Sequence, residues 1–98
     1  MRENKYQSEL IKRIYTIFPD CEVLKNDSRY RQGIPDIIVL LKGFWAMLEV
    51  KASGNASHQP NQEYYVDKFN GYSFAAFIHP ANEEEVLSAL QQAYRDRG

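Results

Sequence analysis

The sequence predicts an α/β fold in which helices flank a mixed β-sheet. Two observations support this: apolar residues recur at helical spacing near both ends of the chain, and two adjacent apolar runs in the middle read as paired strands. The expected order is helix, three strands, helix, strand, helix, or α-β-β-β-α-β-α. At 98 residues, with 44% hydrophobic and 26% charged residues, we expect one domain over residues 1–98.

The first element is a helix over about residues 3–18. It ends before Pro19, because the residue that precedes a proline avoids helical geometry. Residues 21–25 then form a short edge strand, and a polar stretch follows over residues 26–33. The apolar residues that define the helix are Leu10, Ile14, Ile17 and Phe18.

Two apolar runs, residues 34–41 and 44–51, are predicted to form a hairpin. With Lys42-Gly43 as a two-residue turn, Leu41 faces Phe44 and, counting outward, Asp36 faces Glu49. A three-residue loop would shift the pairing by one position, and a bulge would restore it. Either geometry leaves the two carboxylates near one another.

The second half of the chain contains a loop, two helices and a strand. Residues 53–59 form the loop, and Pro60 suits the first turn of a helix that ends at Asn70-Gly71. Residues 73–79 read as a buried strand. A capping box, Asn82 with Glu85, then opens a last helix. The predicted cap of the middle helix is Ser57 or His58-Gln59, and the apolar residues of the last helix are Val86, Leu87, Leu90 and Tyr94.

Composition excludes several classes of protein. A single cysteine, Cys21, provides neither a disulfide framework nor a cysteine-rich zinc site. The apolar runs are too short to cross a bilayer and the polar start lacks a signal sequence, so we expect a cytoplasmic protein without a membrane partner. Residues 1–51 carry nine Lys/Arg against seven Asp/Glu, and residues 52–98 carry three against six. This balance is not by itself a basic DNA-binding pattern.

Three charged side chains converge at the open end of the predicted hairpin. Lys51 lies two residues past Glu49 and therefore on the face shared by Glu49 and Asp36. Facing carboxylates destabilise a sheet unless a cation lies between them, and oxygen ligands suit Mg²⁺ or Mn²⁺. The lysine is then placed to position a water or to neutralise a phosphate. The alternative is an edge salt bridge between Glu49 and Lys51.

Basic and aromatic residues gather in the polar stretch before Asp36. Arg29, Tyr30 and Arg31 suit phosphate contact and base stacking. A solvated loop is the alternative interpretation. Lys25 is a further candidate for a contact with a nucleic-acid backbone.

The remaining aromatic and histidine residues are expected to have structural roles. Tyr64 and Tyr65 are predicted to pack the middle helix onto the sheet. His58 and His79 lack a spaced ligand partner, so we expect surface or structural roles for both.

Several of these residues also match a known motif. Pro35-Asp36 followed by Glu49-Val50-Lys51 resembles the PD-(D/E)XK nuclease motif. The fuller pattern, Gly33-Ile34-Pro35-Asp36, Glu49-Val50-Lys51-Ala52 and Gln62, is similar to the virus-type replication-repair nuclease (VRR-NUC) branch. The resemblance runs from the first helix to the strand at 73–79. It implies a restriction-endonuclease-like fold, metal-dependent DNA cleavage, often at branched or four-way (Holliday) junctions, and a homodimer.

The resemblance also implies residue roles. Asp36, Glu49 and the carbonyl of Val50 would bind Mg²⁺ or Mn²⁺, Lys51 would position the attacking water, and Gln62 would orient that water or the phosphate. Glu9 would complete the metal shell through water. The alternatives are an i, i+4 pair between Glu9 and Arg13, Gln59 in place of Gln62, and Glu3 as a poor substitute for Glu9 near the chain end.

Two rival functions remain open. One is a non-catalytic nucleic-acid-binding or assembly protein on a nuclease scaffold, which the intact Asp36, Glu49 and Lys51 disfavour. The other is a nuclease for linear DNA ends or RNA, which no sequence feature excludes. Small size and the resemblance suggest a role in phage or mobile-element recombination, repair or packaging.

Overall fold

A computed structural model describes residues 2–27 and 29–97. Its element order confirms the predicted α-β-β-β-α-β-α pattern. The elements are α1 (Glu3–Ile17), β1 (Glu22–Lys25), β2 (Ile37–Leu41), β3 (Phe44–Val50), α2 (Gln62–Tyr72), β4 (Phe74–Ile78) and α3 (Glu83–Arg95). Within the described part of the chain, no helix is long and apolar enough to cross a membrane.

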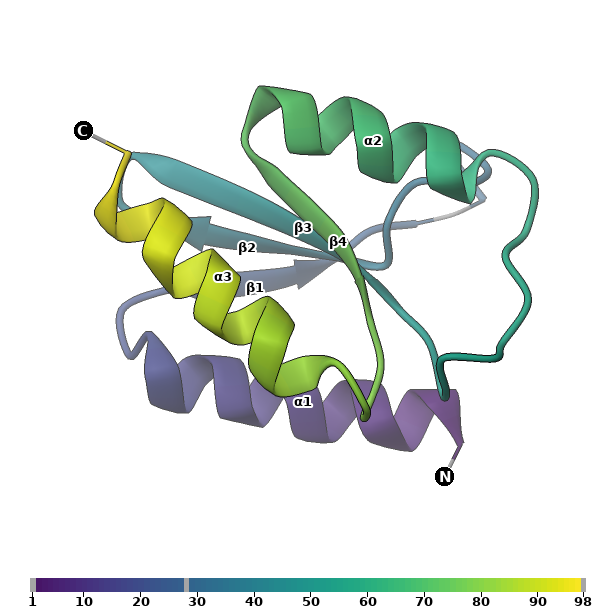
Figure 1. Cartoon of the computed structure of the whole chain (residues 1–98), viewed down its shortest axis with the longest axis horizontal. Helices are drawn as coiled ribbons and strands as arrows, with labels where there is room; N and C mark the ends of the chain where they lie inside the picture. The colour runs from purple at the N-terminus through teal and green to yellow at the C-terminus, as the bar shows by residue number, and fades with distance from the viewer. Residues whose placement is uncertain (1, 28, 98) are drawn as a thin grey trace.

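The strands form one sheet in the order β1-β2-β3-β4. β1, β2 and β3 pair antiparallel, whereas β3 and β4 pair parallel, so the sheet is mixed as predicted. The helix α2 connects the parallel pair, as a crossover between parallel strands requires. Figure 1 shows α1 and α3 together on one side of the sheet and α2 on the other.

The main core lies between the sheet and the helices α1 and α3. Alternate residues of β2 and β3 are buried on this face, as the two-residue repeat of a strand dictates. Leucine and isoleucine side chains from both helices complete it. The most deeply buried members are Leu10, Ile14, Ile37, Val39, Leu48, Val50, Ile78, Leu87 and Leu90.

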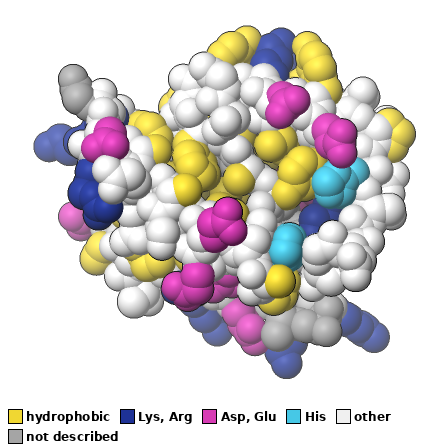
Figure 2. Space-filling model, in the orientation of Figure 1, with side chains coloured by type: hydrophobic (Ala, Val, Ile, Leu, Met, Phe, Trp, Pro, Cys, Tyr) yellow, Lys and Arg dark blue, Asp and Glu magenta, His cyan; other side chains and the backbone are white. Residues whose placement is uncertain are grey.

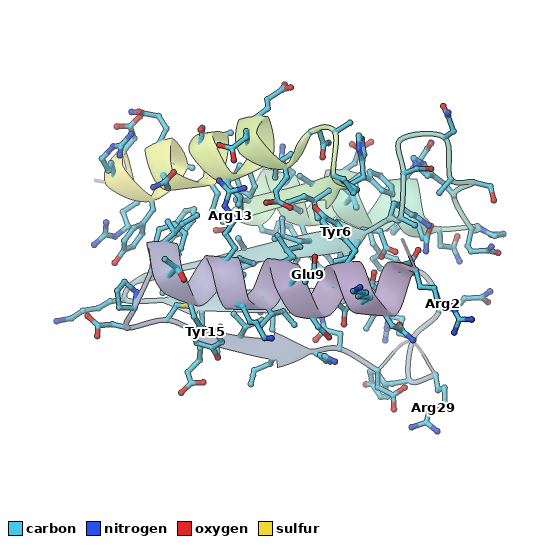
Figure 3. All side chains as sticks on the ribbon, turned by 90° about the horizontal axis from the view of Figure 1, so that it is seen from below. Arg2, Tyr6, Glu9, Arg13, Tyr15 and Arg29 are labelled. Carbon is cyan, nitrogen blue, oxygen red and sulfur yellow. The ribbon has the colours of Figure 1, made fainter. Side chains whose placement is uncertain are left out.

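Polar contacts join α1 to the start of α3. The Tyr6 hydroxyl donates a hydrogen bond to Glu83 Oε1 at 2.7 Å. Arg13 forms ion pairs with both Glu83 and Glu84. Figure 3 shows Tyr6 and Arg13 extending from α1 toward α3. These contacts fix the two helices on the same face of the sheet.

The predicted hairpin turn is confirmed. Leu41 pairs with Phe44, so only Lys42 and Gly43 connect the strands. Gly43 has a φ of 73°, a left-handed conformation that glycine adopts without steric cost.

Both predicted boundaries of α2 are wrong. α2 begins at Gln62 rather than Pro60, because Asn61 has a φ of 75°, which interrupts helical geometry. α2 also continues past Gly71 to Tyr72, since Ser73 N–H still bonds to the Phe69 carbonyl.

The predicted capping box is also absent. Asn82 is the N-cap residue of α3, but it makes no side-chain cap hydrogen bond. Its Oδ1 accepts from the His79 N–H and its Nδ2 donates to the Phe77 carbonyl. The asparagine therefore closes the turn after β4 instead of capping the helix.

Candidate active site

Asp36 lies one residue before β2, directly beyond the last paired position of the hairpin. The final pair is Ile37 with Leu48, so the register brings Asp36 opposite Glu49, as predicted. Asp36 Oδ2 accepts a hydrogen bond from the Val50 N–H at 2.8 Å. The carboxylate thus accepts the hydrogen bond from β3 at a position beyond the last backbone pair of β2 and β3.

Asn26, the residue directly after β1, holds the backbone of this segment. Its N–H donates to the Asp36 carbonyl at 2.8 Å, and its Nδ2 donates to the Pro35 carbonyl at 3.0 Å. Both carbonyls are thereby satisfied, and the Asp36 side chain is directed toward β3.

Glu49 is nearly inaccessible, with 2% of its surface exposed. Gln62 Nε2 donates to Glu49 Oε2 at 3.1 Å. The other oxygen, Oε1, is buried and has no hydrogen-bond donor among the described residues. A buried carboxylate oxygen without a partner is costly, unless a proton or a cation satisfies it.

The pKa of Glu49 is raised to about 8 from its ordinary value of 4.5. Desolvation is the largest cause, and the negative charge of the nearby Asp36 follows. Lys51 opposes the shift, whereas Glu3 adds to it. The site therefore favours an extra positive charge between Asp36 and Glu49.

Lys51 is buried beside these carboxylates, with 6% exposure. Its Nζ donates to Gln62 Oε1 at 2.8 Å and to the Ser57 carbonyl at 3.1 Å. The distance from Nζ to Glu49 Oε2 is longer, 3.8 Å. A salt bridge with Glu49 is therefore present, but the closer contacts of the ammonium are neutral oxygens.

Gln62, the first residue of α2, joins Lys51 to Glu49. Its Oε1 accepts from Lys51 Nζ and also from the Gln59 N–H at 2.8 Å, while its Nε2 contacts Glu49. Because Oε1 faces two donors, the amide orientation is fixed. Gln59 contributes its backbone to this arrangement and lines the same cavity.

These groups line an open, polar cavity of about 850 Å³. The cavity lies between the loop that precedes β2 and the segment that follows β3. Gly33 brings the two together: it has a φ of 94°, and a Cβ there would lie 2.6 Å from the Asn61 Cβ. Other residues of the cavity wall include Glu3, Arg29, Gln32, Ile34 and Ser57.

The acidic residue that α1 contributes to the cavity is Glu3. Glu9, predicted for this position, is exposed and is not part of the cavity wall. In Figure 3, Glu9 lies about half-way along α1, away from the loop that carries Arg29. Glu3 shares the helical face of the buried Tyr6 and Leu10, a spacing that would have identified it.

The candidate nucleic-acid-binding residues are all on the surface. Arg29 lines the cavity and pairs with Asp27, at 3.1 Å from Nε to Oδ1. Tyr30 is 81% exposed, and the Arg31 guanidinium lies 5.9 Å from its ring centroid. Lys25 is exposed at the end of β1, outside the cavity wall.

The two histidines make local contacts. The His58 ring stacks on Phe77 at 4.0 Å between centroids, and its Nδ1 lies 3.0 Å from Glu63 Oε1. His79 Nδ1 accepts from the Ala81 N–H at 3.2 Å. Both arrangements agree with the structural roles expected from the sequence.

The two carboxylates of the site fit a hard divalent cation whose remaining ligands are water molecules. Across residues 2–27 and 29–97, no group of three or more His, Cys, Asp or Glu side chains is arranged to hold a metal ion. Asp36 and Glu49 supply two carboxylates, and the unpartnered Glu49 Oε1 is an available ligand. Mg²⁺ commonly binds to one or two carboxylates and keeps several waters, so the donor set fits that ion.

Sequence reasoning missed two groups that build the site and ranked a third, Glu3, below Glu9. The missed groups are the Ser57 carbonyl, which accepts from Lys51, and Asn26, which holds the backbone next to Asp36. Only Glu3 had a detectable signal, in the helical spacing. The contact of the Ser57 carbonyl with Lys51 and that of the Asn26 side chain with the Pro35 carbonyl depend on how the loops fold back. Local sequence does not reveal this.

Comparisons of this chain with protein-family models, with curated proteins and with solved structures find no match. The fold and the geometry of the cavity are therefore the observations from which a function is inferred.

Proposed function

We propose that this chain is a metal-dependent DNA endonuclease that hydrolyses phosphodiester bonds. The observation that carries the proposal is the buried Glu49, whose Oε1 has no hydrogen-bond partner among the described residues, whose pKa the charge of Asp36 raises, and whose Oε2 lies 3.8 Å from Lys51 Nζ. An acid pair that favours a cation, next to an ammonium group in an open polar cavity, is suited to binding a phosphate.

Asp36 and Glu49 would hold Mg²⁺ or Mn²⁺, with the Val50 carbonyl as the predicted third ligand. A bound divalent ion supplies charge neutralisation at the phosphate and a more acidic water. Lys51 holds a positive charge at the cavity wall, where it positions a water or stabilises charge that develops on the phosphate. Gln62 keeps Lys51 and Glu49 in place through its two hydrogen bonds.

Branched DNA, such as a four-way junction, is the proposed substrate, and a homodimer is the proposed assembly. Two symmetric subunits would cut two strands of a junction. β4 is an edge strand of the described sheet. Figure 2 shows hydrophobic side chains gathered in a hollow between α2 and α3, and Phe74 and Ala76 of β4 are only partly buried. This surface supports the dimer proposal.

The deciding experiment is a cleavage assay on labelled four-way junction, flap, duplex and single-stranded DNA, and on RNA. Each substrate is incubated with Mg²⁺, Mn²⁺ or EDTA. We expect metal-dependent nicks placed symmetrically in the junction, and a loss of about 100-fold or more in Glu49→Gln. Glu85→Gln, an exposed carboxylate on α3, serves as the matched control.

Each other outcome would change the proposal in a defined way. Equal cutting of every DNA would keep the chemistry and remove the junction preference, and cutting of RNA alone would change the substrate. Tight junction binding without cleavage in any metal would favour the non-catalytic nucleic-acid-binding alternative. Light scattering during size-exclusion chromatography tests the dimer separately.

A further inference from the structure

Two exposed tyrosines belong to the two segments that form the cavity, although neither side chain lines it. Tyr30 lies in the loop before β2 and is 81% exposed, and Tyr64 lies in the first turn of α2 and is 58% exposed. Tyr64 was predicted to pack onto the sheet, and that prediction is wrong. Large aromatic surfaces left in water on both of these segments suggest a ligand with flat, apolar faces.

Arg31 links the two segments. Its guanidinium lies 5.9 Å from the Tyr30 ring centroid. The pKa of Arg31 is raised above its usual value, first by a side-chain hydrogen bond with Tyr65 and also by one with Tyr30. The loop and the start of α2 are in close contact nearby, since a Cβ on Gly33 would lie 2.6 Å from the Asn61 Cβ.

The aromatic surface continues along α2. The rings of Tyr64 and Tyr65 contact edge to face, with centroids 5.1 Å apart. Lys68 Nζ lies 5.6 Å from the Tyr64 ring centroid. Figure 2 shows hydrophobic side chains on both sides of a basic one along the outer edge of α2. We call the set Tyr30, Arg31, Tyr64, Tyr65 and Lys68 the tyrosine ridge.

The tyrosine ridge adjoins the candidate active site on two sides. Arg29 and Gln62 both line the cavity. Tyr30 and Arg31 directly follow Arg29 in the chain, and Tyr64 lies two residues after Gln62, at the same end of α2. The ridge therefore lies on the outside of the two segments that form the cavity, next to its rim rather than in its wall.

We propose that the tyrosine ridge binds unpaired nucleotides, with bases stacked on Tyr30 and Tyr64 and phosphates near Arg31 and Lys68. Alternating aromatic and cationic groups form the usual surface for single-stranded nucleic acid. Bases inside a duplex already stack on their neighbours, so only unpaired nucleotides offer a free face. The inference rests on the proposed function, because it assumes that a nucleic-acid strand is cleaved in the cavity. It adds that the nucleotides next to the cleaved bond are unpaired.

The test measures binding without cleavage, by fluorescence anisotropy in EDTA. The probes are labelled oligothymidine, oligouridine, a blunt duplex and an oligonucleotide of the same length with abasic sites. We expect both unpaired oligomers to bind more tightly than the duplex or the abasic strand. The sugar preference between the two separates a DNA ligand from an RNA ligand.

Variants separate stacking from charge and from folding. Tyr30→Leu and Tyr64→Leu should each weaken binding of the unpaired oligomers by roughly 5- to 100-fold, because each removes one stacking surface. Tyr30→Phe and Tyr64→Phe keep the ring and should bind like wild type. Tyr72→Leu, at the far end of α2 and also exposed, is the matched aromatic control. Circular dichroism confirms that each variant is folded.

Lysine variants test the contribution of charge. Lys68→Ala should weaken binding of the unpaired oligomers. It should also make their affinity less sensitive to added salt, because one phosphate contact is absent. Lys12→Ala changes an exposed lysine of α1, on the other side of the sheet, and should have no effect.

The proposal is overturned if the leucine variants bind like wild type, if the abasic strand binds as tightly as oligothymidine, or if folded wild type binds no unpaired oligomer. These results are independent of cleavage. Ring-dependent binding by a protein that cuts nothing would keep the ridge and reject the nuclease. Cleavage that is unchanged in the leucine variants, together with unchanged binding, would keep the nuclease and reject the ridge.

Discussion

The Asp36 carboxylate accepts a hydrogen bond from the Val50 N–H at 2.8 Å, across the open end of the hairpin. One oxygen of Asp36 is therefore used to hold β3, while its charge acts on Glu49. Structure and chemistry at this residue can be separated by two substitutions.

Asp36→Asn keeps an oxygen acceptor for Val50 but removes the charge. We expect its free energy of unfolding to stay within about 1 kcal/mol of wild type, whereas Asp36→Ala should lose about 1–3 kcal/mol because the Val50 N–H is left without a partner. Both should lose Mn²⁺ binding. Urea denaturation measures the stability and isothermal titration calorimetry measures the Mn²⁺ binding. Equal stability of the two variants would show that the hydrogen bond between Asp36 and Val50 does not stabilise the fold.

Cation binding should strengthen as the pH rises toward 8. The pKa of Glu49 is raised to about 8, so at lower pH the carboxyl carries a proton that a metal must displace. We expect Mn²⁺ affinity to increase up to tenfold per pH unit between pH 6 and 8. Calorimetry at several pH values tests this, and a flat profile would show that Glu49 is already ionised.

Without metal, the pH dependence of stability should have the opposite sign. The folded Glu49 retains its proton between its ordinary pKa of 4.5 and about 8, whereas the unfolded chain releases it. The free energy of unfolding should therefore fall as pH rises through this window, by up to about 1.4 kcal/mol per pH unit. In Glu49→Gln that contribution should vanish, which denaturant titrations at pH 5 and pH 8 will measure.

Glu3 and Glu9 make a matched pair on α1. Glu3 lines the cavity and contributes to the raised pKa of Glu49, whereas Glu9 is exposed outside the cavity wall. Glu3→Gln should weaken Mn²⁺ binding by a few-fold, because one nearby negative charge is lost, and Glu9→Gln should leave it unchanged. The reverse result would restore the original prediction for Glu9.

Gly33 and Gly71 test the backbone of the cavity. A Cβ on Gly33 would lie 2.6 Å from the Asn61 Cβ, and its φ of 94° disfavours any side chain. Gly33→Ala should destabilise the protein by about 2 kcal/mol or more and impair the site. At Gly71, within α2, a Cβ meets no atom within 4 Å, so Gly71→Ala should be neutral or stabilising by up to about 1 kcal/mol. Thermal denaturation compares the pair.

The sequence alone predicted the fold well because each element depends on a local pattern. The period of apolar residues defined the helices, and Lys42-Gly43 defined the hairpin register. That register in turn brought Asp36, Glu49 and Lys51 to one cavity. Predictions failed where a side chain had a choice of partners. Asn82, for example, bonds to the turn after β4 instead of to its own helix.

The predictions for Glu9 and Tyr64 were wrong for a related reason. Both lie next to apolar residues in the sequence, but a helix turns by about 100° per residue, so a neighbour along the chain faces another direction. Tyr64 precedes the buried Val66 by two positions and projects into water. Position relative to the buried stripe, rather than proximity in sequence, decides what such residues contact.

β3 is paired on both sides, with β2 and with β4. Amide hydrogens in the middle of such a strand exchange with solvent only when the whole domain unfolds, whereas loop amides exchange through small local openings. Glu49 is therefore anchored to the most persistent part of the molecule, and Tyr30 and Arg29 to a loop. Substitutions in that loop can retune which ligand is recognised while the groups proposed for catalysis keep their geometry.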